Sequence, residues 1–183
     1  LDDMYAQTAP LELGPGARHP FAAPSVFNIS GMSYGAISKP AVRALSKGAA
    51  KAGIWLNTGE GGLSPFHLEG GCDLVFQIGT AKFGVRDARG ALSDERLAEV
   101  AAHDTVRMVE IKLSQGAKPG KGGILPAEKI TPEIAGIRGI PQGQDGISPN
   151  RHREAANFDE LLTLICHVRE VTGKPVGIKT CLG

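Results

Sequence analysis

The amino-acid sequence predicts an α/β fold with mostly parallel strands. Short apolar, β-branched runs alternate with longer runs of helical periodicity, the helical runs begin at capping residues, and polar glycine-rich stretches follow the apolar runs. Alternation of this kind is typical of right-handed βαβ units, which build either a (β/α) barrel or a doubly wound sheet. In both architectures ligands bind at the carboxyl ends of the strands, where the glycine-rich stretches are expected to lie.

The first half of the chain is predicted to contain one helix between two strands. The proline-rich residues 1–24 show no periodicity and are expected to form an irregular N-terminal segment. A helix is expected to begin after Ser38, an N-cap residue with a proline two positions later, and to end at Gly53. Strands are expected on either side of this helix, at 26–30 and 54–57.

The second half of the chain repeats the alternation. A long loop rich in glycine, lysine and proline is expected at 114–126. The last helix is expected to be capped by Asn157 and to bury one apolar stripe. The members of that stripe are Leu161, Leu162, Ile165 and Val168. The other expected elements are strands at 74–78, 108–113 and 175–181 and helices at 93–103, from Thr131 onward and at 158–171.

The composition argues against several classes of function. The chain carries 20 Lys and Arg against 19 Asp and Glu, so no basic face for nucleic acid is predicted. No apolar run approaches the roughly 18 residues that span a membrane, and the first residues lack the positive charge of a signal peptide. The three cysteines lie far apart, which argues against a disulfide framework and against a metal site. These features predict a cytoplasmic protein, in a reducing compartment, without a bound metal.

The stretch Gly-Met-Ser-Tyr-Gly at 31–35 matches the G-x-S-x-G pattern of serine hydrolases. It lies between an expected strand and an expected helix, as a nucleophile elbow requires. Ser33 would then be the nucleophile and would need a histidine, for which His103, His152 and His167 are the candidates. An elbow passes directly into its helix, whereas here the helix is expected to begin several residues later. A serine hydrolase is therefore an alternative function.

Other stretches suggest a ligand site. Residues 57–62, Asn-Thr-Gly-Glu-Gly-Gly, place an amide, a hydroxyl and a carboxylate beside three glycines, which let a backbone approach a ligand. Lys112 and Lys179 lie inside apolar strands, where a buried ammonium must meet an anion or a ligand. On an edge strand the same lysines would face water. The loop at 116–123 is either a solvated surface loop or a site for a carboxylate or phosphate.

Five stretches together resemble the FMN-binding domain of glutamate synthase. Their order and spacing agree with that family over nearly all of residues 25–183, which is far more specific than any single motif. The closest resemblance is to the stand-alone FMN-binding glutamate synthase family of bacteria, which residues 71–79 also resemble. The five stretches are 32–38 (Met-Ser-Tyr-Gly-Ala-Ile-Ser), 57–62, 112–120 (Lys-Leu-Ser-Gln-Gly-Ala-Lys-Pro-Gly), 147–149 (Ile-Ser-Pro) and 177–179 (Gly-Ile-Lys).

This resemblance implies that residues 25–183 are the N-terminal half of an FMN-binding (β/α)8 barrel, a partial TIM barrel. The family reaction aminates 2-oxoglutarate with ammonia to 2-iminoglutarate, which reduced FMN then reduces to glutamate. By resemblance, Glu60 and Lys179 are catalytic, and a lysine near the flavin would stabilise its anionic reduced ring. The implied FMN contacts are Met32, Ser33, Thr58, Gln115 and Lys179. The implied substrate contacts are Glu60, Lys112, Lys118 and Arg138.

The sequence also departs from the family pattern. Ile124 stands where family enzymes that act on 2-oxoglutarate carry a glutamine, which removes an amide donor. The cysteines do not match the ligands of the family's 3Fe-4S cluster. Because the phosphate-binding strands belong to the second half of the barrel, this chain is expected to be an inactive fragment that binds FMN weakly. Its expected partners are 2-oxoglutarate or 2-iminoglutarate and the remaining half of the barrel. A non-catalytic half-barrel that associates with itself through open sheet edges is a further alternative.

Overall fold

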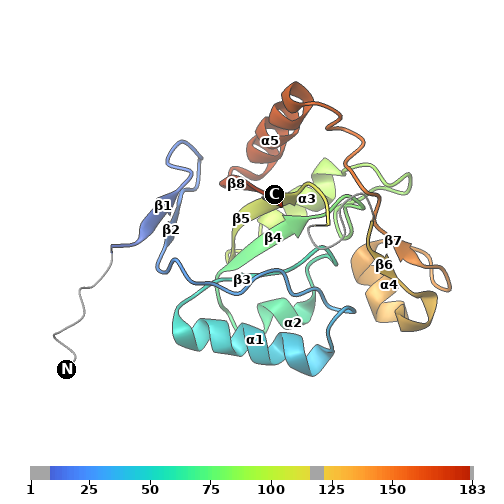
Figure 1. The fold of residues 1–183 in the computed structure, drawn as a ribbon. Coiled ribbons are helices and arrows are strands. Elements are labelled where there is room, and N and C mark those ends of the chain that lie inside the picture. Colours follow the sequence, from blue (N-terminus) through green and yellow to red (C-terminus); the bar gives the residue numbers. More distant parts are fainter. Residues whose placement is uncertain (1–8, 116–121, 182–183) are drawn as a thin grey trace.

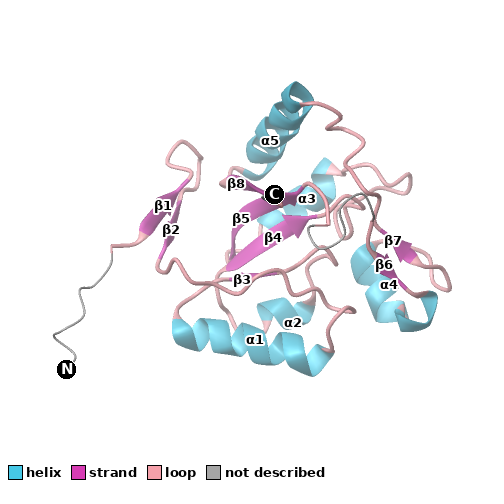
Figure 2. Ribbon diagram, viewed as in Figure 1, coloured by secondary structure: helices cyan, strands magenta, loops and turns pink. Residues whose placement is uncertain are grey.

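A parallel four-stranded sheet forms the centre of the protein (Figures 1 and 2). The computed structural model describes residues 9–115 and 122–181. The strands lie side by side in the order in which they occur in the chain, and every pair is parallel. The prediction of an α/β fold with mostly parallel strands is confirmed, and among the described strands the sheet is not closed. The four strands are β3 (Leu56–Asn57), β4 (Leu74–Ile78), β5 (Val106–Lys112) and β8 (Val176–Lys179).

The strand predicted at 26–30 is reduced to one bridge between Ile29 and Leu56. Asn28 explains the difference, because its side chain accepts a hydrogen bond from the backbone N–H of Trp55 at 3.0 Å and so replaces part of the ladder. Val26 and Phe27 are exposed rather than packed on the sheet. The backbone of Ile29 still extends the parallel order by one position beside β3.

Three helices cover one face of the sheet: α1 (Lys39–Ala52), α3 (Asp94–Ala101) and α5 (Phe158–Thr172). The predicted capping residues Ser38 and Asn157 each accept a hydrogen bond from the first turn of their helix, so both helix starts are confirmed. Alternate strand residues point to these helices and form the main core. Its members from the strands are Leu56, Leu74, Phe76, Ile78, Val106, Val109 and Ile111, and from the helices Ala49, Leu97, Leu164 and Val168.

The buried stripe of α5 differs from the predicted one. Leu164 and Val168 are buried, and Ile165 packs against the core, but Leu162 is exposed and Leu161 is only half-buried. The prediction was wrong for Leu162 because the helix presents the face centred on Leu164 to α3 and β8. Leu161 and Leu162 are adjacent in the sequence, and the sequence pattern did not show which of them faces the core.

Several small elements lie around the sheet and were not predicted. A hairpin of β1 and β2 occupies part of the segment expected to be irregular, because Phe21 and Ala23 are buried there. The helix predicted from Thr131 is confirmed, and it lies within the connection between β6 and β7, two short strands that pair antiparallel (Figure 1). The bounds are β1 (Leu11–Leu13), β2 (Phe21–Ala23), α2 (Pro65–Leu68), β6 (Ile124–Leu125), a 3-10 turn (Ala127–Lys129), α4 (Pro132–Arg138) and β7 (Gly146–Ile147).

Replacing Gly70 by alanine is expected to destabilise the fold by about 1–3 kcal/mol, the usual cost of overpacking. A Cβ at Gly70 would lie against the backbone carbonyl of Ser46 in α1, closer than real Cβ contacts come. Gly48→Ala is the matched control, because its Cβ would meet nothing and alanine favours the helix interior by about 0.5–1 kcal/mol. Urea unfolding measures both variants, and equal free energies of unfolding would show that α1 and α2 do not pack as described.

Candidate functional site

The face of the sheet that the three helices leave uncovered carries a polar network. We call it the polar face and define it by Asn57, Gln77, Glu110 and Lys179, which project from β3, β4, β5 and β8 respectively. The amide of Asn57 donates to the carboxylate of Glu110 at 2.8 Å. The ammonium of Lys179 donates to the side-chain oxygen of Gln77 at 3.0 Å and lies 3.7 Å from the carboxylate of Glu110. Each of the four strands therefore contributes one polar side chain to a connected network.

A second group of polar side chains lies at the carboxyl end of the same strands. We call it the Glu60 cluster and define it by Glu60, Lys112, Gln115 and Ser148. The ammonium of Lys112 lies 3.1 Å from one carboxylate oxygen of Glu60, and the side-chain amide of Gln115 donates to both oxygens at 2.7 and 2.8 Å. The hydroxyl of Ser148 donates to Glu60 at 3.3 Å. The Glu60 and Lys112 side chains are only 18% and 15% exposed, so this ion pair is screened from water far more than a surface pair.

The two groups are neighbours on one surface. Lys112 and Lys179 are register partners in β5 and β8, and Lys112 follows Glu110 by two positions, which places all three on the same side of the sheet. Gly79 follows β4 and leaves room for Glu60, because a Cβ there would lie 2.7 Å from the Cβ of Glu60. The expectation that the glycine-rich stretches gather at the carboxyl ends of the strands is met at this point.

Arg138, a predicted substrate contact, lies beneath the loop that follows Ile29. It is 4% exposed, its guanidinium donates to the backbone carbonyl of Tyr34 at 3.3 Å, and it stacks over the ring of Phe83 at 4.9 Å. Burial lowers the pKa of Arg138, and the negative charge of Glu60 opposes that shift. Its Nε atom is buried without a hydrogen-bond partner among the described residues. This cation is therefore held in place with part of its hydrogen-bonding capacity unused.

Tyr34 links the same loop to α4, and its titration gives a test of this packing. Its hydroxyl donates to Glu133 at 2.6 Å, and burial together with this bond raises the pKa of Tyr34 from 10.0 to about 12. Because the folded state favours the protonated phenol, the stabilisation is complete below pH 10.0 and is lost as the pH rises to about 12. Tyrosinate absorbance should show this late titration, and Tyr34→Phe should remove it. Because the chain contains two tyrosines, the contact would be contradicted if no late step disappeared in Tyr34→Phe.

The predicted FMN contacts from the first part of the chain lie beside the polar face. The backbone N–H of Met32 donates to the carbonyl of Asn57 at 3.1 Å, and Gly59 lies so close to Ser33 that a Cβ would come within 2.6 Å of its backbone nitrogen. Thr58 is buried, with its hydroxyl donating to the carbonyl of Gly59 at 3.1 Å and accepting from the N–H of Gln77 at 3.0 Å. The Thr58 hydroxyl therefore already donates one hydrogen bond to the backbone and accepts another from it.

The remaining predicted residues divide between the two groups. Lys179 belongs to the polar face, whereas Gln115, predicted to contact FMN, lies in the Glu60 cluster with Glu60 and Lys112. Lys118, a predicted substrate contact, lies outside the described residues. Sequence reasoning named Asn57 and Ser148 only within the stretches 57–62 and 147–149, and it gave no role to Gln77 or Glu110. For Glu110 the available signal was its spacing of two from Lys112 within an apolar strand.

The three histidines considered for a serine hydrolase lie away from Ser33. The ring of His152 bonds to the carbonyl of Lys112 at 2.8 Å, and His167 pairs with Asp94 at 2.7 Å on the helix surface. His103 follows α3 and precedes β5, so it lies at the amino-terminal ends of the strands. The described residues therefore contain no histidine of this set that could serve Ser33 as a base.

His67, which the sequence analysis did not consider, approaches the same loop. Its Nε2 bonds to the backbone carbonyl of Met32 at 2.8 Å, and its Nδ1 bonds to the hydroxyl of Ser64 at 2.8 Å. Burial lowers the pKa of His67, so a neutral ring with both nitrogens engaged is favoured. His67 orders the loop that carries Ser33. Both of its ring nitrogens are already hydrogen-bonded, so neither can act as a base for the Ser33 hydroxyl.

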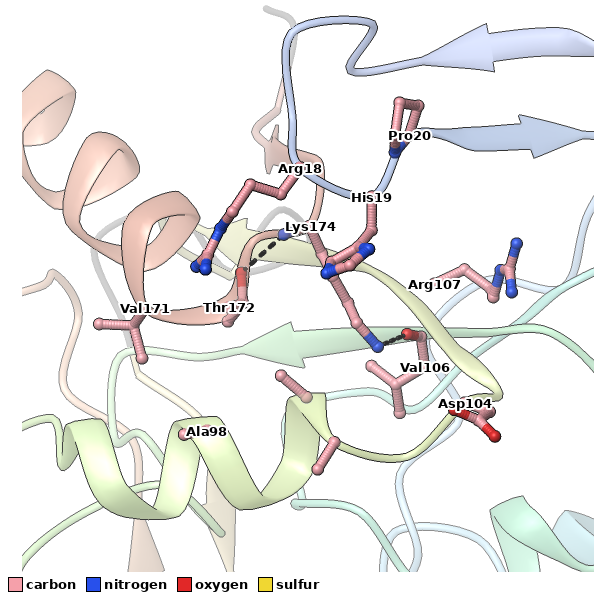
Figure 3. A pocket seen from close by; sticks show the side chains of 12 residues that line it. Arg18, His19, Pro20, Ala98, Asp104, Val106, Arg107, Val171, Thr172 and Lys174 are labelled. Carbon is pink, nitrogen blue, oxygen red and sulfur yellow. Dashed lines mark hydrogen bonds between the residues drawn. The ribbon is translucent and has the colours of Figure 1, made fainter.

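A cavity lined by basic side chains lies at the amino-terminal ends of the strands and has a structural explanation (Figure 3). It encloses about 610 Å³ between the loop before β2 and the C-terminal ends of α3 and α5. Arg18 donates to the carbonyl of Glu170 in the last turn of α5, and the ammonium of Lys174 donates to the carbonyls of His103 and Val106. Cations at helix C-termini satisfy orphan carbonyls and complement the helix dipoles. Arg18 is therefore explained by the end of α5 that it caps, and Lys174 by the backbone carbonyls that it bonds between the end of α3 and the start of β5.

Within the described ranges, no group of three or more histidine, cysteine or acidic side chains is arranged to hold a metal ion. None of the helices in those ranges is both long enough and apolar enough to cross a bilayer.

Comparison with known proteins identifies the family. Residues 13–183 match the family described as the conserved region in glutamate synthase. The chain is 45% identical over 165 residues to the glutamate synthase large subunit-like protein YerD of Bacillus subtilis, covering 90% of this chain and 31% of that protein. It is 41% identical over 150 residues to the archaeal-type glutamate synthase [NADPH] of Thermotoga maritima, covering 81% of this chain and 27% of that protein.

A third relative is the archaeal glutamate synthase [NADPH] of Archaeoglobus fulgidus, which is 41% identical over 158 residues, covering 85% of this chain and 28% of that protein. The chain thus spans less than a third of the length of these three relatives. The family match covers most of the chain, including every described member of the polar face and of the Glu60 cluster. The chain therefore belongs to the glutamate synthase family.

Proposed function

We propose that this chain forms part of an FMN-dependent oxidoreductase domain that reduces 2-iminoglutarate, made from 2-oxoglutarate and ammonia, to glutamate. The observation that carries the proposal is one continuous polar surface, the polar face with the Glu60 cluster, at the carboxyl ends of parallel strands in a member of the glutamate synthase family. A surface of this kind suits a flat polar cofactor with an anionic substrate beside it.

We propose further that the sheet is part of a (β/α)8 barrel, with residues 25–183 as its N-terminal half. In support, the strands follow chain order without a reversal, whereas a doubly wound sheet reverses at its switch point. Helices α1, α3 and α5 cover one face only, as the outer ring of a barrel does, and the polar face would line its interior. The remaining half of the barrel is then the partner that pairs with β8 and with the backbone near Ile29.

The residues of the polar face fit a flavin. The ammonium of Lys179 is a cation suited to a ring that becomes anionic on reduction. At Gly31 a Cβ would lie 3.0 Å from the side-chain oxygen of Gln77, so only glycine leaves this space open beside the network. When bound, FMN would supply the hydride for reduction. The residues proposed to hold it are Met32, Ser33, Thr58, Gln115 and Lys179, with Thr58 acting through its backbone because its hydroxyl is engaged.

The Glu60 cluster fits a dicarboxylate substrate. Lys112 and Arg138 provide cations for carboxylates, and Lys118 is proposed as a third. Reduction of an imine adds a hydride to carbon and a proton to nitrogen. Glu60, 3.1 Å from the Lys112 ammonium, is placed to move that proton through the pair. Ile124 is exposed on β6, so the substrate contact that a glutamine makes in the family would come from another group here.

The proposed activity is tested by adding reduced FMN, ammonia and 2-oxoglutarate to the protein at its full natural length and measuring glutamate. Glutamate formation that requires all three supports the proposal, and residues 1–183 alone are expected to be inactive. Labelling of Ser33 by a fluorophosphonate without glutamate formation would instead support a hydrolase. A chain without either activity whose apparent size grows with concentration would indicate self-association through its sheet edges. A cytoplasmic location, which we also propose, suits the exposed thiol of Cys166.

A further inference from the structure

One segment crosses the carboxyl edge of the sheet and contacts the Glu60 cluster from above. We call residues 146–152 the strap. The backbone N–H of Ser148 donates to the carbonyl of Gly123 at 2.8 Å, and the hydroxyl of Thr80 donates to the carbonyl of Pro149 at 2.5 Å. A Cβ on Gly122 would collide with the carbonyl of Ser148, so the two backbones are in direct contact. The strap is therefore held at several points along its length.

His152, at the end of the strap, is buried against the end of β5. It is 2% exposed, and its Nε2 lies 2.8 Å from the backbone carbonyl oxygen of Lys112. Because a carbonyl can only accept, Nε2 must carry the hydrogen. Nδ1 is buried without a hydrogen-bond partner among the described residues. Burial lowers the pKa of His152, the hydrogen bond to the Lys112 carbonyl opposes this shift, and the charges of Lys82 and Glu154 respectively add to it and oppose it.

The carbonyl that His152 holds belongs to the residue whose ammonium pairs with Glu60. The same strap carries Ser148, whose hydroxyl also donates to Glu60. One imidazole thus fixes the backbone of Lys112 and the end of the segment that bears Ser148. Two of the groups that hold the Glu60 carboxylate are thus linked to a hydrogen bond that is itself outside the cluster.

We propose that His152 is a positioning residue, which sets the place of the Lys112 ammonium and the Ser148 hydroxyl on Glu60 by donating from Nε2 to the carbonyl of Lys112. The link to catalysis rests on the proposed function, whereas the link to Lys112 rests on the described contacts alone. A misplacement of about 1 Å caused by a change far from the chemistry can lower activity by about 10²-fold without removing any reacting group.

The test compares His152→Leu, which removes the donor, with His152→Gln, whose amide can still donate near the Nε2 position. His103→Leu is the matched control, because His103 is exposed and precedes β5, at the opposite end of the strand from Lys112. The first readout needs no activity: acetylation of Lys112 by acetic anhydride, measured by mass spectrometry relative to Lys51 in the same protein. Lys112 is largely buried and ion-paired, whereas Lys51 is exposed.

We expect Lys112 to acetylate several-fold faster in His152→Leu and to remain protected in His152→Gln and His103→Leu. We also expect kcat for glutamate formation to fall about tenfold in His152→Leu, with recovery in His152→Gln. Unchanged Lys112 reactivity in a folded His152→Leu protein would overturn the proposal. If His152→Leu does not fold, His152→Gln provides the test. Fast acetylation of Lys112 in that variant would equally overturn the proposal. If the wild-type protein makes no glutamate, the proposed function fails while Lys112 labelling still tests the positioning role.

Discussion

Replacing Glu60 by glutamine is expected to lower kcat for glutamate formation by about 10²-fold or more, the range typical of lost acid–base groups. The glutamine keeps the size of the side chain and one carbonyl oxygen for Gln115 and Ser148. It removes the negative charge that lies 3.1 Å from the Lys112 ammonium and the group that could move a proton to the imine nitrogen. Steady-state glutamate formation measures the effect, and urea unfolding shows whether the fold is kept.

Glu69→Gln is the matched control for this substitution. Glu69 also pairs with two cations, Arg43 at 2.6 Å and Lys47 at 3.0 Å, and their bonds lower its pKa to about 2. It lies on the outer surface between α1 and α2, so its replacement should leave kcat unchanged. Equal kcat values for Glu60→Gln and the wild type would remove Glu60 from the chemistry, and a loss in Glu69→Gln as large as that in Glu60→Gln would indicate a general effect of charge.

Replacing Lys179 by methionine is expected to weaken FMN binding and to make the bound flavin harder to reduce. Removing one preorganised charge from a polar site commonly costs about 10²-fold in the stabilisation of the charged state. For a two-electron couple this corresponds to a midpoint potential lower by about 60 mV. Glu110 would at the same time lose the cation 3.7 Å away and keep only the amide of Asn57. Fluorescence titration and redox titration of the protein at full natural length measure the two effects.

Lys51→Met serves as the control for Lys179→Met, because Lys51 is exposed in the last turn of α1 and touches neither the polar face nor the Glu60 cluster. FMN affinity and flavin potential should be unchanged in this control. A Lys179→Met protein with the affinity and potential of the wild type would contradict a role for Lys179 beside the flavin. It would leave Lys179 as an internal counter-ion of Glu110.

Local signals in the sequence predicted the helices well. Ser38 and Asn157 cap α1 and α5, and Gly53 and Gly173 end these helices in left-handed conformations that favour glycine. These interactions join residues only a few positions apart, so the sequence contains the whole interaction. The two long strands β4 and β5 were also predicted, because continuous or alternating apolar runs are distinctive.

Contacts between residues far apart in the chain could not be predicted from the sequence. The hairpin of β1 and β2 exists because Phe21 and Ala23 find a place in the core, which a three-residue strand does not signal by itself. The pairing of Asn57 with Glu110 joins residues 53 positions apart, and no pattern around either residue indicates the other. His152 was considered only as a hydrolase base, because its bond to the carbonyl of Lys112 follows from the path of the strap.

For the candidate site, the family resemblance supplied residues and the structure supplied their grouping. Glu60 and Lys112 were expected to contact the substrate and Gln115 to contact FMN, yet the three side chains contact one another directly. Lys179 was expected to contact the flavin. In the structure its ammonium belongs to a network with Gln77, Glu110 and Asn57. The roles proposed for these residues stay predictions until ligands are bound.

The most direct test of a flavin on the polar face is titration of FMN with the protein at its full natural length and with residues 1–183 alone, followed by quenching of flavin fluorescence. We expect saturable quenching at full length, at least tenfold weaker binding by residues 1–183, and loss of affinity in the full-length Lys179→Met protein. Absence of quenching by the full-length protein would contradict the assignment of the polar face to FMN.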